Sequence, residues 1–371
     1  LRFREPRFLD RNLSAGIDLF STRSDFLDVS NFETQTIGGG VSFGFPLTEN
    51  TGLGLRYRLQ SDEINVRDLP IIITDDGNFV QSTVQIAGTN TPDDFSDDEF
   101  RSVEQGDVQA GQILVDQCDP RYVQRNTLCR SERTDLASII GYSFNWDRRN
   151  DPIAPTGGFD MSFSQDFAGI GGDVTYLRTE ATAATYRGIF KGVRASVRLS
   201  GGFIDPLGDD EGVRINNRFF RGGSTFRGFD VAGIGPREVI VSFDNNTGEE
   251  TLLQSGNSLG GRAYWQTTGE LTIPNYLPEE YGIDTALFVE AGSVGFLDEG
   301  PDNDPPRISG IGTDTTQVLV VRDDLSLRAS AGLSVGWDSP FGPIRFDFSQ
   351  ILAREDYDRT ETFRFSTQTS F

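Results

Sequence analysis

The sequence of 371 residues contains no histidine, one methionine and only two cysteines. Without histidine, a Ser-His-Asp triad or any other site built on an imidazole base is excluded. No stretch approaches the ~18 consecutive apolar residues that a membrane helix needs, so a helical membrane span is also excluded. Cys118 and Cys129 lie in one polar segment, where nothing nearby could complete a zinc site. A disulfide between them is the favoured pairing, and it would imply an oxidising compartment.

Positive charge is scarce as well. The chain has 33 Lys and Arg against 56 Asp and Glu, a formal net charge of -23. This balance argues against nucleic-acid binding, because phosphate requires a basic surface that displaces counterions. The aspartates gather in segments such as 91–99 and 298–304. We interpret these segments as solvated loops, and cation-bridged contact with anionic lipopolysaccharide is the alternative.

Glycine and phenylalanine are abundant, with 42 and 29 residues, and the dominant pattern has a period of two. In segment 53–60, Leu, Leu, Tyr and Leu alternate with Gly, Arg, Arg and Gln. Segments 193–200, 331–338 and 344–349 repeat this alternation. The pattern predicts β-strands whose two faces meet different surroundings.

Thirteen strands are predicted in all. They cover residues 1–8, 12–22, 35–47, 51–64, 134–149, 157–169, 173–188, 191–205, 260–274, 282–297, 325–338, 342–354 and 360–371. Short links alternate with long connections at about 65–133, 205–259 and 297–324, and an eight-stranded soluble cup would have too few strands. Short turns on one rim and long loops on the other are typical of outer-membrane barrels. The sequence therefore predicts an all-β fold, a transmembrane antiparallel β-barrel with these three connections as external loops.

Thirteen is an odd number, whereas single-chain bacterial barrels usually close with an even number of strands. The simplest explanation is that strands are missing upstream. The first six residues also lack the apolar core and cleavage site of a secretory signal. We therefore expect either that a signal was removed or that the chain begins inside a longer protein.

One motif points to a family. Residues 222–229 read Gly-Gly-Ser-Thr-Phe-Arg-Gly-Phe, and residues 233–237 follow as Gly-Ile-Gly-Pro-Arg. This segment resembles the sixth-loop motif of the BamA family of outer-membrane protein assembly factors, a hairpin tip that folds back into the barrel. Residues 260–274 and 339–347 resemble the twelfth strand and the turn into the fifteenth strand of the same family. The resemblance runs over nearly the whole chain, in the same order.

The resemblance implies that residues 1–371 are the C-terminal barrel domain of a 16-stranded protein, without its first three strands and its POTRA repeats. It implies folding and insertion of β-barrel proteins by strand templating at the seam between the first and last strands, with no enzymatic activity, cofactor or metal. The implied partners are unfolded outer-membrane proteins, accessory outer-membrane lipoproteins, periplasmic chaperones, membrane lipid and lipopolysaccharide. The implied location is the outer membrane of a Gram-negative bacterium.

Strand parity supplies an independent interpretation of the arginine in the motif. In strands 260–274 and 282–297, Glu270 and Glu290 both fall on the inward parity. A hairpin that turns near residue 280 would place them opposite one another, where they would repel unless a cation lay between them. Arg227 offers the planar fork that can engage two carboxylates, and the resemblance assigns the same contact. We therefore predict a clamp between loop and lumen, and the alternative is that Arg227 is a solvated loop residue. The predicted clamp consists of Phe226, Arg227, Gly228, Phe229, Glu270 and Glu290.

The chain ends in alternating apolar residues and a terminal aromatic, Phe363, Phe365 and Phe371. This ending resembles the carboxy-terminal β-signal of barrel proteins, and it would form one side of the seam. Where some family members have glycine three positions before the end, this chain has Gln368, so the inward kink that such a glycine permits is not implied here.

Three other functions stay open at this point. A passive diffusion pore could use inward arginines such as Arg56 and Arg198, but it would not need the Arg-Gly-Phe segment. A related translocation or secretion barrel would share that segment. An outer-membrane hydrolase would have only Glu270 and Glu290 as a carboxylate pair, and these are better explained as a structural contact.

Overall fold

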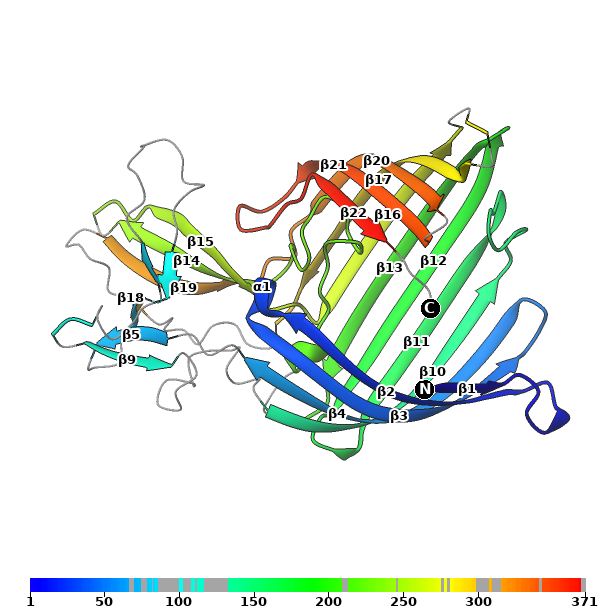
Figure 1. The fold of residues 1–371 in the computed structure, drawn as a ribbon, viewed down its shortest axis with the longest axis horizontal. Coiled ribbons are helices and arrows are strands. Elements are labelled where there is room, and N and C mark those ends of the chain that lie inside the picture. The colour runs from blue at the N-terminus through cyan, green and yellow to red at the C-terminus, as the bar shows by residue number, and fades with distance from the viewer. Residues whose placement is uncertain are drawn as a thin grey trace.

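A computed structural model describes residues 1–66, 70–74, 79–81, 83–85, 100–102, 108–110, 112–116, 133–208, 213–244, 246–274, 277–278, 281–297, 307–308, 315–339 and 342–367. Most of these residues belong to one 13-stranded antiparallel sheet, which curves strongly (Figure 1). In order across the sheet, its strands are β1 (Arg2–Glu5), β2 (Ser14–Phe26), β3 (Phe32–Pro46), β4 (Thr51–Val66), β10 (Arg133–Asp147), β11 (Gly157–Gly172), β12 (Tyr176–Phe190), β13 (Val193–Pro206), β16 (Ala263–Ile273), β17 (Ile283–Gly295), β20 (Arg328–Ser339), β21 (Gly342–Ala353) and β22 (Phe363–Thr367). The predicted all-β fold is confirmed, with each predicted strand in its place.

The sheet is open between its first and last strands. β1 and β22 stand at the two ends of the strand order, and no pairing in the described residues joins them. Within the described residues the two edge strands cover four and five residues, and the strands between them cover 11 to 16. The backbone groups on the outer side of each edge therefore have no strand partner within the described part of the chain.

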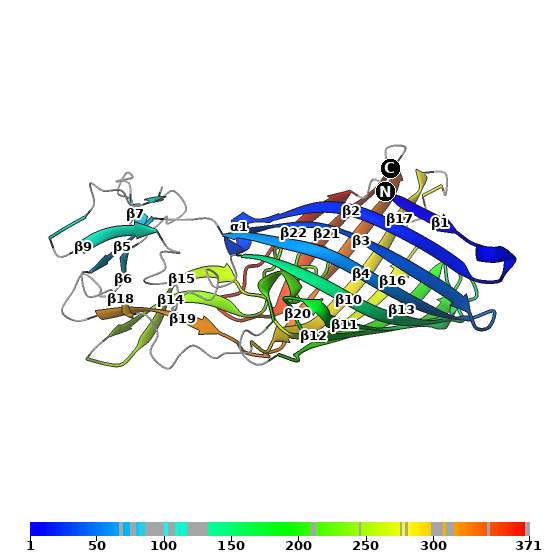
Figure 2. The same ribbon diagram turned by 90° about the horizontal axis from the view of Figure 1, so that it is seen from below.

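Connections at one rim of the sheet are short, and three at the other rim are long. The long connections carry strands of their own, which form small sheets beyond one end of the large sheet (Figure 2). These strands are β5 (Pro70–Thr74), β6 (Phe79–Gln81), β7 (Thr83–Gln85), β8 (Phe100–Ser102), β9 (Gln112–Asp116), β14 (Arg237–Asp244), β15 (Glu250–Ser258), β18 (Arg307–Ile308) and β19 (Thr315–Arg322). Cys118, Cys129 and the acidic segments 91–99 and 298–304 lie outside the described residues.

Helices contribute little to the fold. In the described ranges there are one α-helical turn, α1 (Leu27–Ser30), and the 3-10 turns η1 (Phe8–Asp10) and η6 (Ile215–Asn217). None of the helices in the described part of the chain has the length and apolar character needed to cross a bilayer.

The two faces of the large sheet differ as the period-two pattern predicts. The outer face exposes apolar side chains: Val197 is 45% exposed, Leu199 53% and Leu287 46%. Leu53 and Leu333, on the same face, are half-buried and belong to no core cluster in the described residues. Exposed apolar side chains along a whole sheet face indicate that this face does not meet water.

The core lies inside the curve of the sheet. The connection from β13 to β14 turns back into this space, and we call its residues 213–236 the inner loop (Figure 1). Phe219, Phe226 and Phe229 of this loop are buried in one cluster with Tyr264 of β16 and Val294 of β17. The inner loop therefore packs as part of the hydrophobic core, against the inner wall of the sheet.

Candidate functional site

Arg227 lies at the tip of the inner loop, with its charge directed at the inner wall. It is 6% exposed, and its Nε donates a hydrogen bond to Glu290 Oε1 at 2.7 Å. Its backbone N–H donates to Glu290 Oε2 at 2.9 Å, and its carbonyl oxygen accepts a hydrogen bond from Ser330 Oγ at 2.6 Å. Backbone and side chain are both fixed by the wall, so the structure brings the loop arginine and a β17 carboxylate into one buried contact.

The second carboxylate is reached by the other arm of the guanidinium. Arg227 Nη1 donates to Glu270 Oε2 at 3.2 Å and to Ser334 Oγ at 3.0 Å. Its Cζ lies 3.7 Å from the centre of the Phe288 ring, which is within the range of a cation–π contact. Arg227 therefore bridges strands β16, β17 and β20 through a single planar group.

The predicted register of these two carboxylates is wrong by two residues. Glu290 lies opposite Thr268, and Glu270 lies opposite Phe288, so the glutamates are diagonal neighbours. The pairing is symmetric about residue 279, and the centre of so long a turn cannot be read from the sequence. The offset has a structural consequence, because it places the Phe288 ring opposite Glu270 and beneath the guanidinium.

A second arginine, Arg345, belongs to the same network. Arg345 Nε donates to Asp347 Oδ1 at 2.9 Å, and Arg345 Nη2 lies 3.5 Å from Glu270 Oε2. Ser334 links the two arginines, because it accepts from both and donates to Asp347. Two guanidinium groups thus face three carboxylates in a network that spans strands β16 to β21.

Glycine is required next to Arg227. Gly228 has a φ of +92°, and an added Cβ would lie 2.9 Å from both Ile351 Cδ1 and Ser330 Cβ. A side chain here would be strained by the backbone and would push the tip away from the wall. The aromatic residues on either side, Phe226 and Phe229, contact each other edge to face with ring centres 5.2 Å apart. Phe226 and Phe229 pack the tip into the hydrophobic core, while Arg227 bonds it to the glutamates of the wall.

The two glutamates should differ in their contribution to stability. Glu290 is 4% exposed and receives two hydrogen bonds from Arg227, whereas the Glu270 side chain is 31% exposed and receives one. We expect Glu290→Gln to lower the free energy of unfolding by about 3–5 kcal/mol, as for a broken buried pair. Glu270→Gln, the matched control, should cost about 1 kcal/mol. Thermal unfolding in detergent would measure both, and equal losses would contradict the assigned geometry.

The inner loop also contacts the connection between β21 and β22. Asp230 N donates to Arg359 O at 3.0 Å, and Arg359 N donates to Gly233 O at 2.9 Å. Glu361 N donates to Gly228 O at 3.0 Å. These bonds pair the backbone of the loop tip with the segment that leads into the edge strand β22. The position of the loop and the position of that edge strand are therefore coupled.

A buried ion pair holds this connection in turn. The side chains of Arg328 and Asp358 are fully buried, and Arg328 Nε lies 3.0 Å from Asp358 Oδ2. Arg328 Nη2 also donates to the Tyr357 hydroxyl at 3.1 Å, and Nη1 donates to the carbonyl oxygens of Asp324 and Ser326. Burial raises the pKa of Asp358, against the opposing effect of Arg328. The pair is thus well bonded but costly to desolvate.

The edge strand itself presents aromatic side chains outward. Phe363 and Phe365 are 47% and 53% exposed, and the Phe365 ring lies 5.4 Å from that of Phe346 on β21. Gln368 and Phe371, the other residues of the predicted β-signal, lie outside the described residues.

Sequence reasoning missed several contributors. Ser334 and Asp347 fall on the polar parity of segments 331–338 and 344–349, but nothing in the sequence indicated that they would meet Arg227 or Arg345. The pair formed by Arg328 and Asp358 gave no local signal, because its members are 30 residues apart. Among the described residues, no group of three or more His, Cys, Asp and Glu side chains is placed to hold a metal ion.

Comparison with known proteins finds relatives over all or part of the chain. The chain is similar to the outer membrane protein assembly factor BamA of Neorickettsia risticii, with 24% identity over 373 residues, 100% of this chain and 39% of the relative. It is also similar to the sorting and assembly machinery component 50 homolog of Bos taurus, with 31% identity over 175 residues, 45% of this chain and 34% of the relative. The chain thus spans between a third and two fifths of the length of these relatives.

The fold has a counterpart among solved structures. The crystal structure of BamA from Haemophilus ducreyi lacking POTRA domains 1-3 superposes with a TM-score of 0.66 at 18% identity, over 98% of this chain and 60% of that one. The model of the Omp85 superfamily domain matches residues 1–371. With its whole length matched, the chain belongs to the Omp85 superfamily.

Proposed function

We propose that this protein folds and inserts β-barrel proteins into the outer membrane of a Gram-negative bacterium. Family membership supports a role in β-barrel assembly, since the relatives named above are assembly factors. Relatives are found in animals as well as bacteria, so the bacterial location belongs to the proposal.

The observation that supports the proposed mechanism most is the unpaired edge of the described sheet at β22. In the described part of the chain this strand has five residues and pairs with β21 alone, so its other side offers N–H and C=O groups to a further strand. Unpaired backbone at a sheet edge templates an added strand. In a bilayer such pairing lowers the cost of bringing a polar backbone into hydrocarbon. An incoming client strand would therefore add at β22.

The inner loop has a supporting role in this mechanism. Arg227 fixes the loop tip to the wall, and the tip pairs with the connection that leads into β22. We propose that this arrangement is the clamp, and that it keeps the edge strand in position while a client strand pairs with it. The reaction uses no enzymatic step, cofactor or metal ion.

The proposed partners follow from the same role. They are unfolded outer-membrane proteins as clients, with accessory outer-membrane lipoproteins and periplasmic chaperones that deliver or receive them. Membrane lipid and lipopolysaccharide would contact the outer face and the long connections.

Reconstitution of the protein distinguishes the proposed function from two rival functions. The complete protein would be reconstituted in liposomes with an urea-unfolded outer-membrane barrel as client, and its conductance would be recorded in planar bilayers. We expect client folding to be faster than in empty liposomes by about tenfold or more, equivalent to ~1.4 kcal/mol of barrier. A large steady conductance without faster folding would instead indicate a diffusion pore. Export of a soluble passenger without faster folding would indicate a translocation barrel.

A further inference from the structure

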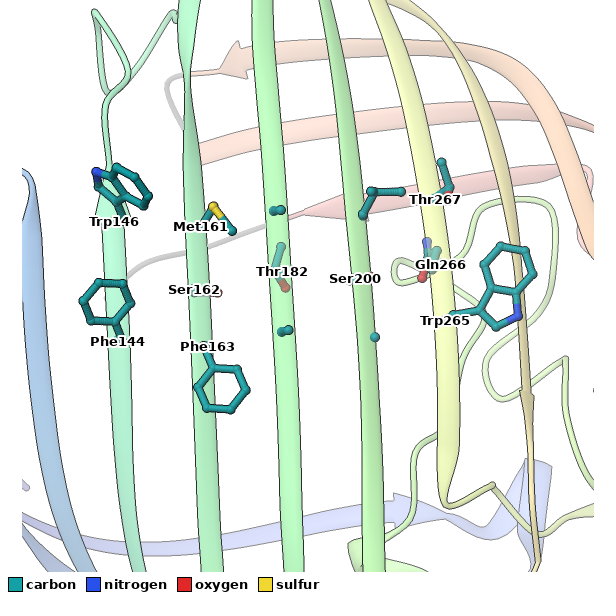
Figure 3. A pocket seen from close by; sticks show the side chains of 14 residues that line it. Phe144, Trp146, Met161, Ser162, Phe163, Thr182, Ser200, Trp265, Gln266 and Thr267 are labelled. Atoms are coloured by element: carbon teal, nitrogen blue, oxygen red, sulfur yellow. The ribbon is translucent and has the colours of Figure 1, made fainter.

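A groove of about 400 Å³ lies on the outer face of the large sheet, over strands β12 and β13. Figure 3 shows Phe144 and Trp146 of β10 on one side of it and Trp265 of β16 on the other. Between them, the small side chains on this face are Ala181 and Ala183 of β12 and the glycine Gly201 of β13. The volume falls within the ~300–1,000 Å³ of ordinary small-molecule sites.

Strand register explains the shape of the groove. Across β10, β11, β12 and β13, Trp146 lies opposite Met161, Met161 opposite Ala183, and Ala183 opposite Leu199. Leu199 lies opposite Thr267 of β16. Facing residues in an antiparallel sheet have neighbouring side chains. Side-chain size along this row therefore falls from two large residues to alanine and increases again at leucine.

The adjacent row on the same face repeats the profile. Phe144 lies opposite Phe163, Phe163 opposite Ala181, and Ala181 opposite Gly201. Gly201 lies opposite Trp265, which is 45% exposed. The two rows share a low floor at Ala181, Ala183 and Gly201, with aromatic residues of β10 and β11 on one side and Leu199 and Trp265 on the other.

The chemistry of the groove is that of hydrocarbon. Nothing that lines it is charged, and its outward residues are apolar apart from Thr267. It is continuous with the exposed apolar surface of the sheet, which includes Val197 and Phe203. On a sheet that spans a bilayer, this surface meets lipid chains.

We propose that this groove binds one acyl chain of a membrane phospholipid, in preference to the lipid that surrounds the rest of the outer face. The proposal rests on the proposed membrane location of the sheet. A chain seated between the two aromatic walls would fill a space that the small side chains leave empty, and it would gain the dispersion contacts of both walls.

The three tryptophans of the chain provide the test. Trp146 and Trp265 border the groove, whereas Trp337 on β20 is 39% exposed on the same face, outside it. The complete protein would be prepared in versions that keep one of these as the sole tryptophan. Each would be reconstituted in bilayers with increasing fractions of a phospholipid brominated in its acyl chains, which quenches tryptophan on contact. We expect half-maximal quenching of Trp265 and Trp146 at a mole fraction about threefold lower than for Trp337, a preference of less than ~1 kcal/mol.

Filling the groove should remove the preference. Ala183→Phe adds a ring at the floor, and Ala331→Phe adds the same ring on the outer face of β20 as the matched control. We expect Ala183→Phe to bring the quenching curve of Trp265 to that of Trp337, and Ala331→Phe to leave it unchanged.

Identical curves for all three tryptophans in the parent protein would overturn the acyl-chain site while leaving the membrane location intact. Absence of quenching at Trp337 would contradict the membrane location itself. Protection of Trp265 alone from bromine would show that protein occupies the groove, and would also overturn the proposal.

Discussion

Replacing Arg227 with alanine is expected to release the tip of the inner loop and to slow client folding at least about tenfold, a barrier increase of ~1.4 kcal/mol or more. The variant loses bonds to Glu290, Glu270 and Ser334, and it leaves Glu290 charged and buried without a cation. Breaking a buried pair in this way costs about 3–5 kcal/mol. The large sheet should still insert, because its strand pairing does not depend on the loop. Folding assays with client protein in liposomes and thermal unfolding in detergent would measure the two effects.

Two control variants show whether the effect is specific to the site. Arg23→Ala removes an arginine that pairs with Glu33, with its side chain 68% exposed, and should leave thermal stability close to that of the parent protein. Arg227→Lys keeps the charge but loses the planar fork, so it should restore only part of the activity. An Arg227→Ala protein with unchanged heat stability and full client-folding activity would refute the clamp.

Loss of the buried arginine at the start of β20 is expected to have the next largest effect. Arg328→Met removes the only cation bonded to Asp358 in the described residues, together with bonds to Tyr357 and two carbonyl oxygens. We expect a loss of about 3–5 kcal/mol in the free energy of unfolding. The connection between β21 and β22 should loosen, since this pair anchors it. Thermal unfolding and limited proteolysis within residues 354–361 would report the change.

A second substitution tests whether the uncompensated charge is the cause. Asp358→Asn removes that charge and keeps an oxygen that can accept from Glu355 N, a bond of 2.8 Å in the structure. The double variant with Arg328→Met should therefore be more stable than Arg328→Met alone. If the double variant were the less stable of the two, the loss would come from packing and not from the buried carboxylate.

The large sheet could be predicted from sequence because each strand carries its own signal. Alternation along segments such as 53–60 and 193–200 fixes which residues face outward, and antiparallel pairing of consecutive strands follows from the short links. The strands inside the long connections were not predicted. β14 and β15, for example, belong to a separate small sheet with β18 and β19 and not to the large sheet.

The site was predictable in its members but less so in its geometry. Parity placed Glu270 and Glu290 inward, and the Arg-Gly-Phe segment indicated what would meet them. The register of a hairpin depends on its turn, and the turn between Ile273 and Ile283 is too long for the sequence to fix its centre. The role of Phe288 depends on that register, so it could not be foreseen.

Contacts between the inner loop and the edge connection were beyond sequence reasoning for a different reason. Asp230 and Arg359 meet through backbone atoms, which any residue type can supply. Such pairing leaves no compositional trace, and the partners are more than a hundred residues apart in the chain. Only the folded arrangement shows that the loop tip is hydrogen-bonded to the segment that leads into β22.

The most direct test of the clamp is a double-mutant cycle on Arg227 and Glu290, with the rate of client folding in liposomes as the readout. Arg227→Ala and Glu290→Ala would be measured singly and together, with protein insertion checked in each case. If the two residues act as one contact, the double variant should fold client no more slowly than the worse single variant, which gives a large coupling energy. Losses that simply add would contradict the claim that the loop acts through this contact with the wall.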